Sequence, residues 1–91
     1  MAFEIQYKKS VVKDLRNLDK VEARRTVDKL ERELKKDPGA GEQLKGKFAG
    51  LSRLRVGDYR VVYTRTKVGV LVLLIAHRKD VYKKLEQGTQ F

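Results

Sequence analysis

The chain has no cysteine, no tryptophan, one histidine and one proline among its 91 residues. Without cysteine it can form neither a disulfide framework nor a thiolate metal site, and this usage suits a reducing cytoplasm. One histidine is too few for the usual zinc ligand sets, and most acids are typical of helix caps and of surface partners of lysine. The sequence therefore gives little support to metal catalysis, and we expect no metal and no other cofactor.

Long apolar stretches are also missing. The longest clean run, residues 70–76, is much shorter than the roughly 20 residues that span a membrane, so we interpret it as a buried strand. The N-terminal residues alternate between apolar and polar types, whereas a signal peptide begins with basic residues and continues with an apolar block. We expect a cytoplasmic protein without membrane contact, with residues 1–91 forming a single domain.

Acidic residues are scarce in the second half of the chain. Residues 1–44 contain 11 Lys and Arg against 9 Asp and Glu, whereas residues 45–91 contain 11 against 3. The formal net charge of +10 therefore divides into +2 and +8. A charge that served only solubility would have no reason to concentrate in one half, whereas a surface that binds nucleic acid would.

Three arginines, Arg53, Arg55 and Arg60, lie between apolar residues in segment 51–63, where Asp58 is the single acid. The planar guanidinium fork can bind two phosphate oxygens at once, and it stays charged at every physiological pH. A solvated charged face is the alternative interpretation. The alternation of arginine with strand-forming residues favours a polyanion-binding surface.

The first half of the chain predicts a strand and a helical hairpin. Residues 3–7 alternate with the period of a half-buried strand. Ser10 is a candidate N-cap of a first helix, and Asp19 with Glu22 forms a capping-box pattern that opens a second. The second helix is expected to end at residues 37–39, because proline and glycine both oppose its continuation. Each helix has one apolar stripe, formed by Val11, Val12, Leu15 and Leu18 in the first and by Ala23, Val27, Leu30 and Leu34 in the second.

The second half predicts a sheet. Residues 37–50 contain four of the seven glycines and are expected to form a loop with a short turn around Leu44. Strands are expected at residues 51–56, 59–66 and 70–76, and the short turns between them force antiparallel neighbours. A short helix is expected from about Val81 to Gln87. The order β-α-α-β-β-β-α predicts an α+β fold, with the two-helix hairpin packed on one face of a mostly antiparallel four-stranded sheet.

The alternation of side chains along the strands places the arginines relative to the core. In the middle strand, Arg60 lies on the face opposite Tyr59 and Tyr63, which we expect to be core or sheet-covering residues. Arg53 and Arg55 share a face of the preceding strand. Hairpin pairing would bring Arg60 alongside one of them, on the side of the sheet that the helical hairpin leaves uncovered.

The residues argue against several kinds of hydrolytic site. After residue 44 the acids are only Asp58, Asp80 and Glu86, so paired-carboxylate hydrolysis finds little support. Gly39-Ala-Gly41 follows a helix, so it is not a P-loop or a dinucleotide fingerprint. Metal-free chemistry at a phosphate remains. In RNA the 2′-hydroxyl already lies next to the scissile phosphorus, and an enzyme can act by aligning it and neutralising the charge that develops.

The segments Leu54-Arg-Val-Gly-Asp-Tyr-Arg-Val-Val-Tyr63 and His77-Arg-Lys-Asp-Val-Tyr82, with the order of elements, resemble the RelE branch of the RelE/ParE toxin superfamily. The resemblance covers essentially the whole chain. It implies a toxin of a type II toxin–antitoxin system that enters the ribosomal A site and cuts the mRNA there. Such a cut leaves a 2′,3′-cyclic phosphate and a 5′-hydroxyl.

The resemblance also implies roles for four catalytic residues. Arg60 matches the family arginine that holds the scissile phosphate, and Arg53 matches a basic residue that stabilises developing negative charge. Arg78 matches the basic residue before the C-terminal tyrosine. Tyr82 matches that tyrosine, which in the family stacks on the substrate base or takes part in proton transfer.

Further candidate RNA contacts are Lys45, Lys47, Arg55 and His77. Leu51 stands where some relatives carry an additional lysine of the catalytic cluster, and Lys45 and Lys47 could supply charge from the loop instead. His77 is a residue type that suits a general acid or base near neutral pH. At the end of an apolar strand it could equally hydrogen-bond the backbone.

The implied partners are a cognate acidic antitoxin, in a toxin–antitoxin hetero-oligomer, and the ribosome with its mRNA. The antitoxin would be partly disordered when free and would mask the basic surface. Two alternatives stay open on the same fold. One is a ParE-like toxin that inhibits DNA gyrase, and the other is an RNA- or ribosome-binding module that does not cleave, which Leu51 keeps plausible.

Overall fold

The computed structural model describes residues 3–87. Its elements, in chain order, are β1 (Glu4–Tyr7), α1 (Lys9–Arg16), α2 (Lys20–Lys36), β2 (Glu42–Gln43), a 3₁₀ helix η1 (Gly46–Phe48), β3 (Ser52–Val56), β4 (Tyr59–Arg65), β5 (Gly69–His77) and α3 (Val81–Gln87). None of the helices between residues 3 and 87 combines the length and apolar content that a bilayer crossing demands.

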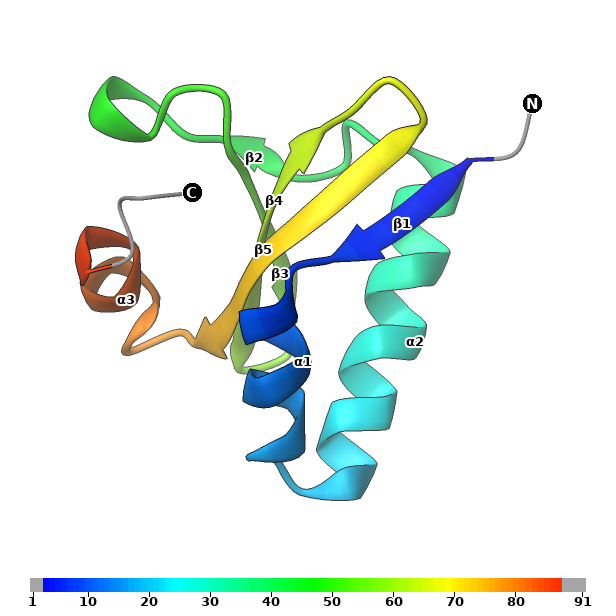
Figure 1. Ribbon diagram of the computed structural model, residues 1–91, viewed down its shortest axis with the longest axis vertical. Coiled ribbons are helices and arrows are strands. Elements are labelled where there is room, and N and C mark those ends of the chain that lie inside the picture. Colours follow the sequence, from blue (N-terminus) through cyan, green and yellow to red (C-terminus); the bar gives the residue numbers. More distant parts are fainter. Residues whose placement is uncertain (1–2, 88–91) are drawn as a thin grey trace.

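The strands form one sheet in the order β1-β5-β4-β3-β2. β1 runs parallel to β5, and the other neighbours are antiparallel. The helices α1 and α2 pack on one side of this sheet and α3 lies on the other (Figure 1). The predicted α+β fold is confirmed, but the predicted number of strands is wrong. The fifth strand, β2, lies in the segment interpreted as a loop, where two residues are too few to show a period of two.

The main core lies between the sheet and the α1–α2 hairpin. Leu30 and Leu34 of the predicted α2 stripe are fully buried, and so is Val11 of α1. The fully buried set of α2 also includes Thr26, which the apolar pattern did not indicate because its side chain carries a hydroxyl. Val12 was expected in the α1 stripe but is 42% exposed, because α1 offers the sheet a narrower face than the pattern suggested.

The N-terminal capping of α1 and of α2 differs from the prediction. α1 begins at Lys9 with Lys8 as the N-cap, so Ser10 lies inside the helix and does not cap it. Asp19 is the N-cap of α2 as predicted, but its side chain makes no capping hydrogen bond. Backbone hydrogen bonds therefore hold the short connection at residues 17–19 in place. One of them runs from the Ala23 N–H to the Asp19 carbonyl oxygen at 2.8 Å.

The β3–β4 hairpin fixes which residues share a face of the sheet. Gly57 in its two-residue turn has a φ of 60°, a conformation that glycine adopts without steric cost. With this turn, Arg55 pairs with Arg60 and Val56 pairs with Tyr59. A register shift between Val62 and Tyr63 places one extra residue in β5, and this reverses the faces that the β5 residues take. Val72 packs in the main core, whereas Leu74, two residues on, packs in the apolar cluster beneath α3.

Tyr63 ties β2 to the core. It is fully buried, as predicted for a core residue, and its hydroxyl accepts a bond from the Gly41 N–H and donates one to the Pro38 carbonyl, both at 3.0 Å. A Cβ at Gly41 would lie 2.6 Å from the Tyr63 hydroxyl oxygen and 3.0 Å from the Arg53 carbonyl oxygen. Glycine at position 41 therefore allows the chain to pass close enough for β2 to join β3.

A second, smaller apolar cluster lies beneath α3 on the opposite side of the sheet. Val81 and Leu85 of α3 pack there on Val62, Leu74 and Ala76 of the sheet. The partly buried residues around this cluster are Leu44, Phe48 and Leu51. The predicted C-terminal helix is confirmed at Val81–Gln87.

Candidate functional site

Four arginines gather on the side of the sheet that carries α3, and we call them the arginine cluster: Arg53, Arg55, Arg60 and Arg78. Arg55 pairs directly with Arg60 across the β3–β4 ladder. Hairpin pairing was expected to bring either Arg53 or Arg55 alongside Arg60, and the structure shows that it is Arg55. Partial burial lowers the pKa of Arg60, and the charges of Arg55, Arg53 and Arg78 lower it further, whereas Asp58 opposes this. The three neighbouring cations thus lie close enough to repel Arg60, and an anion bound among them would relieve that repulsion.

The guanidinium of Arg60 is held by the backbone of its own hairpin. Its Nη1 donates to the carbonyl oxygen of Gly57 at 3.0 Å and to that of Tyr59 at 2.9 Å. A guanidinium has five N–H donors, and these two carbonyls occupy only one of its nitrogens. The side chain is therefore fixed in place while it retains donors for a phosphate.

Arg53 links the sheet to α3 and to β2. Its Nη1 donates to the hydroxyl of Tyr82, and its guanidinium carbon lies 5.5 Å from the centre of the Tyr82 ring. Its Nη2 donates to Oε2 of Glu42 at 2.8 Å. Tyr82 is 47% exposed, so its ring is accessible to a nucleotide base while Arg53 orients its hydroxyl.

Glu42 is a site residue that sequence reasoning missed. It lies in β2, directly across the ladder from Arg53, and β2 was not recognised as a strand. The available signal was an acid between the glycines of segment 37–50, just before the arginine-rich hairpin, but only pairing with β3 shows what it contacts. A shallow cleft of about 390 Å³ opens here, lined by Ala40, Glu42, Arg53, Leu54, Arg55 and Arg60.

The structure separates His77 from the arginine cluster. His77 pairs with Tyr59 in the ladder, and the two rings meet edge to face at 5.8 Å. Its Nδ1 accepts a hydrogen bond from the Lys79 N–H at 3.2 Å. His77 and Tyr59 line a small hollow together with Asp14 of α1, so His77 lies on the helical-hairpin side of the sheet. Burial raises the pKa of Asp14 in that hollow, against the opposing charges of Lys84 and Lys13.

The loop lysines and Leu51 lie beside α3. Lys47 forms an ion pair with Glu86 of α3 and lies over the Phe48 ring at 5.4 Å. Lys45 is exposed just before η1. Leu51 is half-buried against the apolar cluster beneath α3. Its packing there gives position 51 a structural role in this chain in place of a charge.

Arg78 lies at the end of β5, beside the β3–β4 turn. Arg78 follows β5, and its backbone N–H donates to the Asp58 carbonyl at 2.8 Å, which ties the end of β5 to the β3–β4 turn. Its side chain is exposed. Between residues 3 and 87 there is no group of three or more His, Cys, Asp or Glu side chains that could hold a metal ion.

A family model described as the ParE toxin of type II toxin–antitoxin system, parDE, matches residues 5–82. In the archaeal RelE–RelB complex from Pyrococcus horikoshii, a chain is 30% identical to this one with a TM-score of 0.67, and the match covers 86% of this chain and 97% of that chain. Among curated proteins, none matches.

Two further solved structures share the fold. A RelBE toxin–antitoxin complex from Mycobacterium tuberculosis superposes with a TM-score of 0.78 at 23% identity, covering 86% of this chain and 100% of that chain. The isolated RelE toxin of E. coli gives a TM-score of 0.67 at 22% identity, covering 94% and 97%.

Proposed function

Since this chain belongs to the ParE toxin family of type II toxin–antitoxin systems, within the RelE/ParE superfamily and with RelE-like structural relatives, we propose that it is a ribosome-dependent endoribonuclease that cuts mRNA in the A site. The observation that carries the proposal is that Arg53, Arg55 and Arg60 line one cleft on the face of the sheet that carries α3, with Tyr82 on Arg53. A phosphate among these cations would find several guanidinium donors at once.

The proposed reaction uses the nucleophile that RNA supplies. The 2′-oxygen attacks the adjacent phosphorus, the bond from phosphorus to the 5′-oxygen breaks, and a 2′,3′-cyclic phosphate forms while the 5′-oxygen takes up a proton. Negative charge grows on the phosphoryl oxygens in the transition state, and Arg60 and Arg53 are placed to stabilise it. The reaction needs no metal, because the cations are part of the protein.

Two side chains beside Arg53 are candidates for the proton transfers. The carboxylate of Glu42 can accept the proton of the 2′-hydroxyl, and the hydroxyl of Tyr82 can donate one to the leaving 5′-oxygen. Arg53 contacts both and so holds them within reach of one phosphate. Tyr82 also offers its exposed ring for stacking on a base.

Mapping of mRNA ends on programmed ribosomes tests the proposal. Purified protein is expected to produce cuts in the A-site codon, with a cyclic phosphate on the upstream fragment. Intact mRNA together with blocked DNA supercoiling would instead establish gyrase inhibition, the alternative that the name of the matching family model favours. Ribosome binding without cleavage would establish the non-cleaving module, which the packing of Leu51 favours.

Binding to the ribosome is expected to weaken steeply with salt. Four phosphate contacts to single-stranded RNA correspond to a slope of about −3 in log K against log salt, or roughly a 50-fold loss between 50 and 200 mM. The measurement is a filter-binding titration on ribosomes whose A-site codon carries 2′-deoxy sugars, at constant magnesium. A flat response would contradict the role of the arginine cluster as a phosphate clamp.

Glu42 is expected to compete with RNA for Arg53. The Glu42→Gln variant should bind the uncleavable mRNA about two- to fivefold more tightly, because an exposed ion pair of this kind contributes up to about 1 kcal/mol. Glu33→Gln, on α2, makes the same change in net charge away from the cluster and serves as the control. Equal or weaker RNA binding by Glu42→Gln would show that Glu42 does not compete.

A further inference from the structure

The C-terminal helix α3 rests on the sheet through few apolar side chains. It has seven residues, of which Val81 and Leu85 are buried. A helix this short is marginal by itself, so its place depends on tertiary contacts. Val81 and Leu85 are four residues apart and form one line along the helix. A helix held along a single line can rotate about its own axis without leaving the apolar cluster beneath it.

Two polar contacts lie along a second line of α3. Tyr82 and Glu86 are also four residues apart, so their side chains lie one turn apart on the same face of the helix. The Tyr82 hydroxyl accepts a hydrogen bond from Arg53 of β3. One turn later, the Glu86 carboxylate accepts one from the ammonium of Lys47 in η1 and forms an ion pair with it. This face of α3 is therefore joined to the sheet at one end and to η1 at the other.

The loop that carries Lys47 is itself fixed to the sheet. The Thr64 hydroxyl of β4 donates to the Gly50 carbonyl oxygen at 3.0 Å, just after η1. The Lys47 ammonium lies 5.4 Å from the centre of the Phe48 ring, and Phe48 packs on the apolar cluster beneath α3. Lys47 therefore meets Glu86 from a loop that both a hydrogen bond and apolar packing hold in place.

We propose that Lys47 and Glu86 are a positioning pair, which fixes the rotation of α3 about its axis and so keeps the Tyr82 hydroxyl on Arg53 at the cleavage site. Both residues lie outside the six that line the cleft of the arginines, so the pair acts through Tyr82. When the pair is broken, the apolar contacts still hold α3 on the sheet, but Tyr82 spends more time away from Arg53. The inference rests on the proposed function, because it concerns the part that Tyr82 takes in cleavage.

Direct contact between Lys47 and RNA is the alternative role for this lysine. A carboxylate beside an ammonium group offsets the attraction that the ammonium exerts on a phosphate. Residues 45–91 contain only 3 acids, Asp58, Asp80 and Glu86, and the last of them is placed on Lys47. The pairing therefore favours the positioning role over a phosphate contact.

Exchange of the two charges tests the pair. Lys47→Glu and Glu86→Lys each replace the attraction with a repulsion. Each should slow single-turnover mRNA cleavage on programmed ribosomes, at saturating protein, about three- to fivefold, which is the scale of one exposed ion pair. The double variant restores the pair with its charges exchanged and keeps the net charge of +10, so it should cleave within about twofold of the wild type.

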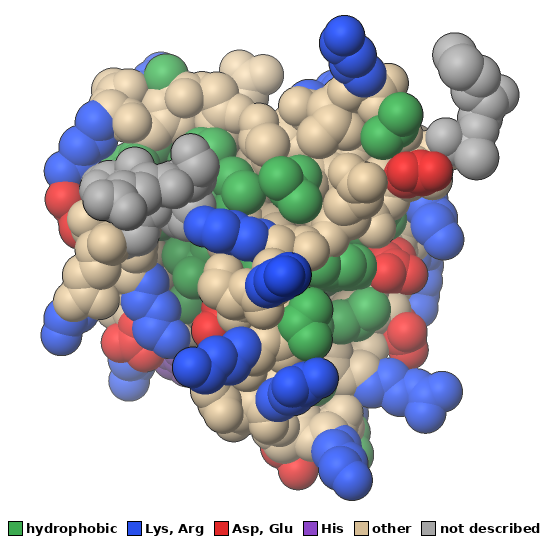
Figure 2. Space-filling view, viewed as in Figure 1, with side chains coloured by type: hydrophobic (Ala, Val, Ile, Leu, Met, Phe, Trp, Pro, Cys, Tyr) green, Lys and Arg blue, Asp and Glu red, His purple; other side chains and the backbone are tan. Residues whose placement is uncertain are grey.

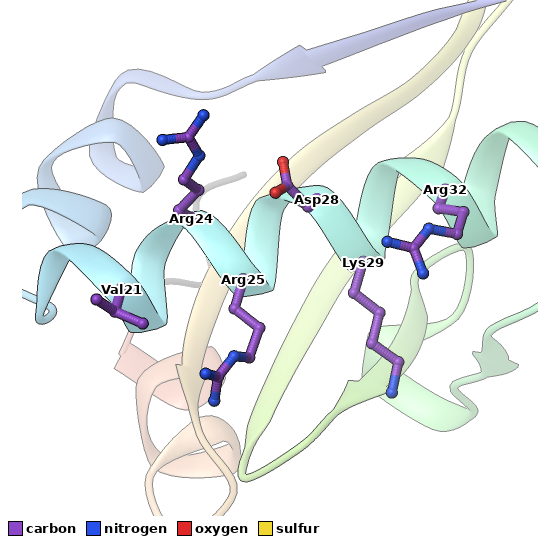
Figure 3. A pocket seen from close by; sticks show the side chains of 6 residues that line it. All are labelled: Val21, Arg24, Arg25, Asp28, Lys29 and Arg32. Atoms are coloured by element: carbon purple, nitrogen blue, oxygen red, sulfur yellow. The ribbon is translucent and has the colours of Figure 1, made fainter.

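Variants on α2 control for the change in net charge. Lysines and arginines are spread over the molecular surface in Figure 2, so a change of charge anywhere alters the field that RNA meets. Asp28 and Lys29 are exposed and line a shallow depression on α2, on the other side of the sheet from α3 (Figure 3). Lys29→Glu and Asp28→Lys make the same two changes in net charge, and each should cleave within about twofold of the wild type.

The position of Tyr82 can be followed without any cleavage. The protein contains four tyrosines, so incorporation of fluorotyrosine gives one fluorine NMR signal for each, and Tyr82→Phe identifies the signal of Tyr82. In Lys47→Glu and in Glu86→Lys this signal should move toward that of free fluorotyrosine, and in the double variant it should return. Circular dichroism verifies that the fold persists. Because this measurement needs no ribosome, it decides the inference even if the protein cuts no mRNA.

An unchanged Tyr82 signal in both single variants overturns the inference. Slow cleavage by the single variants with no recovery in the double variant also overturns it, because Lys47 or Glu86 would then act on the RNA directly. Recovery of both the signal and the rate in the double variant supports it, since exchanging the two charges would not restore a contact with RNA.

Discussion

The Arg60→Ala variant is expected to lose about 10²- to 10³-fold in the rate of mRNA cleavage on programmed ribosomes, the effect of removing one preorganised donor from a developing anion. Arg60 lies across from Arg55, and two backbone carbonyls hold its guanidinium. An alanine there leaves a hole in the middle of the cluster. Expression of the variant should no longer arrest growth.

Two matched variants decide whether the loss is specific. Arg65→Ala removes an exposed arginine from the end of the same strand and should cleave within a few-fold of wild type. Arg60→Lys keeps the charge but loses the planar fork, so its rate should stay well below wild type. Growth arrest by Arg60→Ala at the wild-type level, with the fold intact by circular dichroism, would disprove the assigned role.

The Tyr63→Ala variant is expected to lose about 3–5 kcal/mol of unfolding free energy, the usual cost of truncating a large core aromatic residue. Tyr63 is fully buried and bridges Gly41 and Pro38 through its hydroxyl. A domain of ordinary stability has only about 5–15 kcal/mol in total, so the variant should unfold at a much lower urea concentration.

The hydroxyl can be tested separately from the ring. Tyr63→Phe keeps the packing but leaves the Gly41 N–H and the Pro38 carbonyl without their partner, so a loss of about 1–3 kcal/mol is expected. Tyr59→Phe changes a half-buried tyrosine of the same strand and should change stability by less than about 0.5 kcal/mol. If urea unfolding placed Tyr63→Phe level with Tyr59→Phe, the proposed anchoring of the 38–41 segment would be wrong.

The candidate site was predictable to the extent that its residues follow strand alternation. Arg53, Arg55 and Arg60 could be assigned to one face because side chains alternate along a strand, and the Gly57-Asp58 turn restricts the pairing. Tyr82 and Arg78 came from the resemblance of the C-terminal segment to a family. Glu42 could not be found in this way, because its position depends on a two-residue strand that pairs across a loop.

The face of the sheet on which His77 lies could not be predicted from the strand pattern. Its residue type suits acid–base chemistry, but a strand pattern cannot say which face the last residue of a strand takes when the strand contains a bulge. The register shift near Val62 and Tyr63 changes which β5 residues face each side. His77 consequently packs on Tyr59 and bonds to the Lys79 backbone, away from Arg53 and Arg60.

The sequence by itself determined the order of the three helices and the four longer strands, the apolar face of α2 and the concentration of cations in the sheet half. Local periodicity and charge are properties of neighbouring residues. Only the tertiary structure decided that α3 covers the face opposite the hairpin and that Glu42 meets Arg53. These features join residues distant in the chain, and their positions follow from how the strands pair and how the two cores fill.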